Sequence, residues 1–89
     1  MKKRWVRTTA KDDGSWEIMY CLGDSEKKAI GVRITVGYGI RPRHAAVMRI
    51  EDRCVTYLPE QELPVGVSGL ALNTWMWSVA SSEYGRLWD

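Results

Sequence analysis

Phenylalanine is absent from this chain of 89 residues, and Cys, Pro and His are scarce, with two, three and one residue respectively. Without Phe, the five Trp and four Tyr must supply the large apolar surfaces of the core, and their N–H and O–H groups need partners or access to water. One His and two isolated Cys are too few for a zinc site unless scattered carboxylates contribute, and no Cys-x-x-Cys pair occurs. We therefore predict that the protein holds no metal and no cofactor.

Long hydrophobic runs are also absent, because no segment approaches the ~18–20 apolar residues that a membrane-spanning helix needs. Residues 1–4 resemble the charged start of a signal peptide, but the apolar run that should follow stops after Val6. We therefore expect a cytoplasmic protein that contacts no membrane. In that compartment we expect Cys21 and Cys54 to be reduced and mostly buried, with a disulfide or a functional thiol as the alternatives.

The composition is that of an ordinary small globular protein, with 45% apolar and 27% charged residues. No internal repeat, low-complexity tract or linker divides the chain. Residues 1–89 are therefore expected to form a single small globular domain with a modest core.

Charge is distributed unevenly along the chain. Residues 1–49 hold 11 of the 13 Lys and Arg against five Asp and Glu, which gives +6, whereas residues 50–89 hold two basic and six acidic residues, which gives −4. Such asymmetry bears on partners rather than on fold. We expect the cations of the early strands to gather on one side of a compact sheet, apart from the carboxylates of the later segments.

Alternating apolar residues predict several strands. Segments 5–10 and 16–22 flank Asp13-Gly14, a strong signal for a two-residue hairpin turn. A turn at residues 23–26 should lead to the clearest strand, residues 29–38, in which Ile and Val alternate with small or polar residues.

A second hairpin is predicted from segments 46–50 and 54–58, joined across Glu51-Asp52. Its apolar side chains should line one face. They are Met48, Ile50, Val55 and Tyr57.

The last third of the chain admits two interpretations. Leu72, Met76 and Val79 have helical spacing, Ser68 or Asn73 could cap the helix, and Gly85 suits its end. Residues 69–79 also fit a strand, although residues 80–84 continue a helix better. We therefore predict an α+β fold, an antiparallel sheet of about five strands with one C-terminal helix packed on a face.

The candidate catalytic motifs in the sequence are incomplete. Residues 37–39 resemble the start of a dinucleotide fingerprint, but Pro42 stands where the third glycine belongs and no helix-forming segment follows. Ser68 lacks the final glycine of a nucleophile elbow, and the only His available as its base is His44. Exposed carboxylates in predicted turns, such as residues 12–13, make poor acid catalysts at neutral pH. We expect no catalytic residue and no enzyme.

Cations stand beside aromatic residues at the N-terminus and around Tyr38, Arg41 and Arg43. Surfaces that bind nucleic acid use this mixture, yet no nucleic-acid-binding motif is present. The same basic residues could instead contact an acidic surface of a partner protein or face bulk solvent. Arg33 and Arg49 should both project from the face opposite the Ile/Val row if the third and fourth strands are phased accordingly.

Trp75 and Trp77 should diverge by about 200° on a helix, so one of them should be partly exposed. Core packing is the default for both, whereas an exposed Trp could anchor a protein contact. Trp88 is a candidate for a contact with a partner or a second copy of the chain.

Our first functional hypothesis is a non-enzymatic protein-binding module, a small inhibitor or adaptor that acts on a larger macromolecular machine through a basic face and an exposed Trp. Small phage or mobile-element proteins that block host nucleases or CRISPR effectors have this scale. Its partner would present an acidic surface, for example on a nucleic-acid-processing complex. The second hypothesis is a domain that binds single-stranded nucleic acid or RNA, and the third is a homodimer. The predicted partner-binding residues are Lys27, Lys28, Arg33, Tyr38, Arg41, Arg43, Arg49, Trp75, Trp77 and Trp88.

Overall fold

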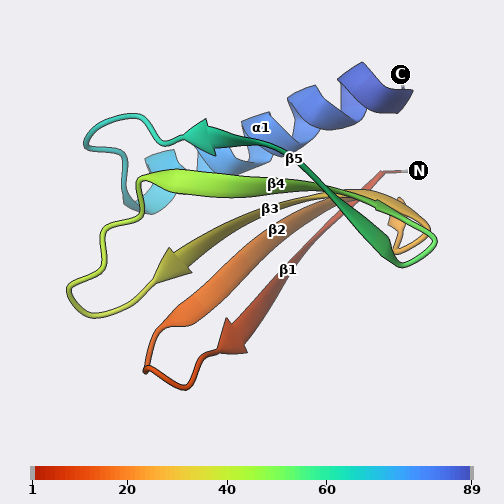
Figure 1. The fold of residues 1–89 in the computed structure, drawn as a ribbon. Helices are drawn as coiled ribbons and strands as arrows, with labels where there is room; N and C mark the ends of the chain where they lie inside the picture. The colour runs from red at the N-terminus through yellow and green to blue at the C-terminus, as the bar shows by residue number, and fades with distance from the viewer. Residues whose placement is uncertain (1, 89) are drawn as a thin grey trace.

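A computed structural model describes residues 2–88 of the chain. Five antiparallel strands form one sheet in the order β1-β2-β3-β4-β5, and a single long helix lies across one face of it (Figure 1). The fold is therefore α+β, as predicted from the sequence. The elements are β1 (Lys3–Ala10), β2 (Trp16–Ser25), β3 (Lys28–Val36), β4 (His44–Glu51), β5 (Cys54–Glu62) and α1 (Gly69–Trp88).

The main core lies between the sheet and α1. Ile30 and Val32 project from β3 toward the helix, and Val47 joins them from β4. Met76 and Tyr84 belong to the buried stripe of α1, since residues separated by multiples of four lie close to one helix face. Each fully buried apolar side chain of this size contributes roughly 1.5–3 kcal/mol, so this contact holds the helix on the sheet.

The first hairpin turns at residues 12–14, a loop one residue longer than expected. Lys11 N–H donates to the Ser15 carbonyl at 2.9 Å, and Gly14 N–H donates to the Lys11 carbonyl at 3.1 Å. Gly14 has φ of +84°, a conformation that glycine adopts at little cost. The prediction of a turn at Asp13-Gly14 was correct in place, but the loop is of the three-residue class.

The next two turns also differ from the sequence prediction by a few residues. Strand β2 continues through an irregularity to Ser25, so the chain turns at Glu26 and Lys27 rather than across residues 23–26. Between β4 and β5 the turn is Asp52-Arg53, one residue later than expected, with φ of +49° and +68°. Two non-glycine residues with positive φ give no turn signal in the sequence, which explains the shift.

Helix α1 confirms the helical interpretation of the tail and rules out the strand alternative. It runs past Gly85, where we expected it to end, as far as Trp88. The extra turn is held by packing, because Leu87 and Trp88 contact the core while Tyr84 is buried in it. That packing offsets the cost of glycine within a helix, about 1 kcal/mol.

Candidate functional site

The ten predicted partner-binding residues do not form one surface. Five lie where the helix meets the sheet: Lys28, Arg49, Trp75, Trp77 and Trp88. The others are spread over the turn before β3, the opposite face of the sheet and the β3–β4 loop: Lys27, Arg33, Tyr38, Arg41 and Arg43.

Cations from the strands stack on aromatic rings of the helix. The Arg4 guanidinium lies 5.0 Å from the Trp77 ring centroid, and the Lys28 ammonium lies 5.4 Å from that of Trp88. The Arg49 guanidinium lies 5.6 Å from the same Trp88 ring. We call these five residues the helix–sheet seam. The basic character of the early strands is thus used in part within the protein itself, through cation–π contacts.

Arg49 lies on the face that carries α1, not on the opposite face as expected. It pairs with Ile30 across β3 and β4, so the two side chains share a face. Arg49 also binds Glu51 at 2.5 Å. That hydrogen bond is the main reason why the pKa of the Glu51 carboxyl is lowered.

Trp75 and Trp77 are both half-buried and pack against the core from either side of the buried stripe of α1. Trp77 also meets Tyr20 edge to face, with ring centroids 5.0 Å apart. Both are partly exposed, so the expectation that at least one would be partly exposed on a helix is confirmed. The Trp with the largest exposure is Trp16, at the start of β2.

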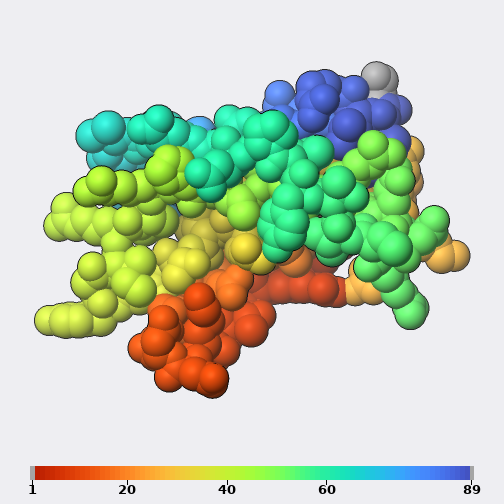
Figure 2. All heavy atoms as spheres, viewed as in Figure 1, coloured from red at the N-terminus to blue at the C-terminus, as the bar shows by residue number. Residues whose placement is uncertain are grey.

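The β3–β4 loop carries three exposed residues of the predicted set. Ile40 N–H donates to the Gly37 carbonyl at 3.1 Å, and this tight turn places Tyr38, fully exposed, at its tip. Arg41 and Arg43 form no ion pair with any part of the chain between residues 2 and 88. The loop projects from one end of the molecule, in yellow-green at the left of Figure 2.

The face of the sheet opposite α1, here called the open face, is unusually apolar at its centre. One row of paired residues crosses all five strands and consists of Trp5, Cys21, Gly31, Met48 and Tyr57. Antiparallel sheets with one solvated face ordinarily place polar residues there. Within residues 2–88 no other element covers this face. The middle of the row is buried beneath neighbouring side chains, with Cys21 1% and Met48 3% exposed, whereas Tyr57 at one end is 61% exposed.

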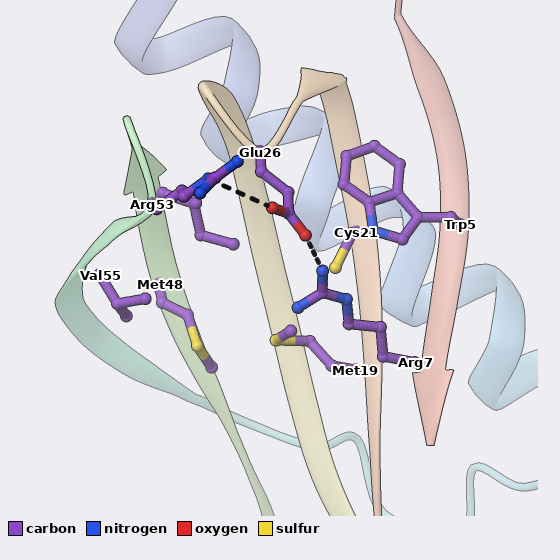
Figure 3. A pocket seen from close by; sticks show the side chains of 9 residues that line it. Trp5, Arg7, Met19, Cys21, Glu26, Met48, Arg53 and Val55 are labelled. Carbon is purple, nitrogen blue, oxygen red and sulfur yellow. Dashed lines mark hydrogen bonds and ion pairs between the residues drawn. The ribbon is translucent and has the colours of Figure 1, made fainter. Parts of the chain in front are cut away.

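A hollow of about 180 Å³ opens in this face toward the end that carries the β2–β3 and β4–β5 turns. Gly31 keeps the hollow free of an additional side chain, because a Cβ at this position would lie only 2.9 Å from the Met19 sulfur. Figure 3 shows the side chains that line it. They are Trp5, Arg7, Met19, Cys21, Glu26, Met48, Ile50, Arg53 and Val55.

The rim of the hollow is charged. Glu26 accepts a hydrogen bond from Arg7 and lies 3.9 Å from the Arg53 guanidinium (Figure 3). The Arg53 side chain is 86% exposed, so its ion pair with Glu26 is loose. Two guanidinium groups therefore share a single carboxylate, and the rim carries surplus positive charge.

Cys21 in the floor is a neutral thiol at neutral pH. Burial raises its pKa to about 11, against a smaller opposing effect of Arg7. A thiol in this state behaves as a small apolar group rather than as a nucleophile. Both cysteines are free, but Cys54 is exposed, so the expectation that both would be buried was wrong for Cys54.

The sequence predicted only part of the open face. Met48, Ile50, Val55 and Tyr57 do share a face as predicted, because they lie at matching positions of the β4–β5 hairpin. Arg33 is also on this face, bound to Glu17 at 2.9 Å and to the Tyr57 hydroxyl at 3.3 Å. What the sequence missed is the hollow, which requires Met19 and Cys21 to lie across Gly31 from Met48.

No family model, no curated protein and no solved structure matches this chain. Within the described part of the chain no helix is long and apolar enough to cross a membrane. Nor do residues 2–88 bring together three His, Cys, Asp or Glu side chains in a group that could hold a metal ion.

Proposed function

We propose that the protein is a non-enzymatic, cytoplasmic protein-binding module, an inhibitor or adaptor, and that the open face of its sheet is the interface. The observation that carries this proposal is the exposed apolar surface that β5 adds to that face. Val55 is 50% exposed and Tyr57 is 61% exposed there, although both continue a surface of buried apolar residues. Contiguous exposed apolar surface of this kind marks interaction sites.

The size of the molecule is adequate for such an interface. Its two larger dimensions are 37 and 27 Å, so one broad side covers about 1,000 Å². A standard protein interface buries about 800 Å² on each partner. The unpaired, exposed thiol of Cys54 accords with a reducing compartment.

The charges of the open face favour a partner with acidic groups. Lys3 belongs to this face with Arg7 and Arg33, because alternate residues of a strand share a face and paired residues lie opposite each other. Arg53 adds a further cation at the rim. Among the residues that line the hollow, Glu26 alone opposes Arg7 and Arg53, so complementary charge on a partner at the hollow would be negative.

Capture from a lysate of cells that naturally make the protein tests this proposal. Immobilised wild-type protein should retain a discrete set of proteins, and Val55→Asp with Tyr57→Asp should lose them because charge is introduced on the open face. The matched control is Val65→Asp with Leu70→Asp, which adds the same charges at exposed apolar residues after β5. If the variant with Val55→Asp and Tyr57→Asp retained the same proteins, the proposal would be refuted.

Binding to single-stranded nucleic acid or RNA is the second candidate function. It is favoured by the Arg33 guanidinium, which lies 5.8 Å from the exposed Tyr57 ring and could continue a stack onto a base. Affinity should then fall linearly with log salt. Absence of any mobility shift with single-stranded and double-stranded oligonucleotides at low salt would remove this candidate.

A further inference from the structure

We infer that the hollow in the open face is a pocket for one large apolar side chain of a partner polypeptide, and that a carboxylate close to this side chain in the partner pairs with Arg53. This inference rests on the proposed function and specifies the chemistry of its ligand. The occupant to which it commits is an acidic, apolar peptide segment.

The dimensions of the hollow suit a single side chain. Its volume is about 180 Å³. An apolar protein cavity of about 150 Å³ is large enough for a benzene molecule. A Leu, Met or Phe side chain is therefore of the right size, whereas a helix or a planar cofactor is not.

The walls of the hollow are chemically adaptable. Met19 and Met48 present thioethers from two strands that flank β3, and Ile50 and Val55 complete one side. Methionine is flexible and polarisable, so it fits side chains of different shapes and recurs on surfaces that bind several peptides. Trp5 adds an aromatic wall on the edge strand β1 (Figure 3).

The charge of the rim specifies the neighbouring group. Arg7 already occupies one side of Glu26, and Arg53 reaches Glu26 only at 3.9 Å. Asp52, the other residue of the turn, forms no ion pair with the cations of the described chain. Arg53 is thus free to form a close pair with a carboxylate supplied from outside, which a bound acidic segment would provide.

The surroundings of the hollow favour a polypeptide over a small molecule. Tyr57 lies beside Met48 on β5 but does not line the hollow, and its 61% exposure extends the apolar surface past the pocket. A small molecule in the hollow would leave this extension uncovered. A peptide with one side chain in the hollow can also lie along β5 and cover it.

Peptide selection followed by methyl NMR tests the inference. A library of random linear peptides is selected against the wild-type protein, and enriched peptides are titrated into protein carrying ¹³C-methyl Met. The chain supplies its own control, since Met76 is 0% exposed in the core on the other side of the sheet. We expect enriched peptides to share an acidic residue near a large apolar one, and to shift Met19 and Met48 but not Met76.

Variants on both sides of the contact sharpen the result. Changing the acidic residue of the peptide to its amide, or introducing Arg53→Glu, should weaken binding about tenfold. The two changes together should weaken binding little more than either change alone. Lys27→Glu is the matched control, because it reverses an unpaired charge in the neighbouring β2–β3 turn without touching the hollow. Its effect should be less than about twofold.

Three results would overturn the inference: failure to enrich any peptide, enriched peptides that leave Met19 and Met48 unshifted, or binding that is insensitive to Arg53→Glu. These outcomes are separable from failure of the proposed function. If capture is lost with the Val55 and Tyr57 variant but survives Arg53→Glu, the open face is the interface and the pocket assignment alone is wrong.

Discussion

Neutralising the cations of the helix–sheet seam should destabilise the protein substantially. The triple variant Arg4→Gln, Lys28→Gln and Arg49→Gln removes the cations that stack on Trp77 and Trp88. A cation over a ring at a partly exposed site contributes about 0.5–1 kcal/mol, so the free energy of unfolding should fall by roughly 1.5–3 kcal/mol. The loss would be a large fraction of the roughly 4–13 kcal/mol expected for a domain of this length.

Urea unfolding followed by far-ultraviolet circular dichroism measures this loss. The control is Lys11→Gln, Arg41→Gln and Arg43→Gln, which removes the same charge from exposed positions with no ion pair or ring contact to residues 2–88. We expect the control to change the free energy of unfolding by less than about 0.5 kcal/mol. Equal stability of the two triple variants would refute the reasoning, because the early cations would then have no structural role at the helix.

Three further predictions concern the core, the thiols and one carboxyl. Met76→Ala should lower the free energy of unfolding by about 2–5 kcal/mol in the same urea assay, because the side chain is fully buried; a loss below about 1 kcal/mol would contradict its place in the core. An aromatic disulfide reagent should modify Cys54 in the native protein and Cys21 only after unfolding, and rapid reaction of both would be inconsistent with the burial of Cys21. Hydrogen bonds from the Ser15 side chain and backbone lower the pKa of Asp13 below 3.8. The folding stability that these bonds add is present above pH 3.8 and is lost as pH falls through the pKa of the folded protein. NMR titration should show that the pKa of Asp13 rises in Ser15→Ala, and an unchanged pKa would refute this cause.

The order and type of the elements could be predicted from the sequence because they depend on local patterns. Period-two alternation located the strands, and helical spacing from Leu72 onward located α1. The phase between strands could not be predicted with the same success. Arg49 was placed on the wrong face because the pairing of Ile30 with Arg49 depends on the long β3–β4 connection, whose Gly and Pro residues predict a turn but do not fix the register of the two strands.

The seam and the hollow were beyond sequence reasoning for a related physical reason. Arg4 meets Trp77, and Lys28 meets Trp88, only because the helix returns across the sheet to the strands that precede it. The hollow likewise depends on Gly31 lying between Cys21 and Met48 in neighbouring strands. Alternation within one strand defines a face, but the depth of that face depends on side chains from its neighbours.

The meander order of the sheet has a consequence for biosynthesis. Each strand pairs with the next one in the chain, so hairpins can assemble early and quickly during translation. Helix α1 is translated after all of them, and until it arrives Ile30 and Val47 face water on one side of the sheet while Tyr57 is exposed on the other. A nascent chain that exposes apolar surface on both faces of its sheet is prone to self-association. Chaperone supply and growth temperature should therefore govern the soluble yield of this protein.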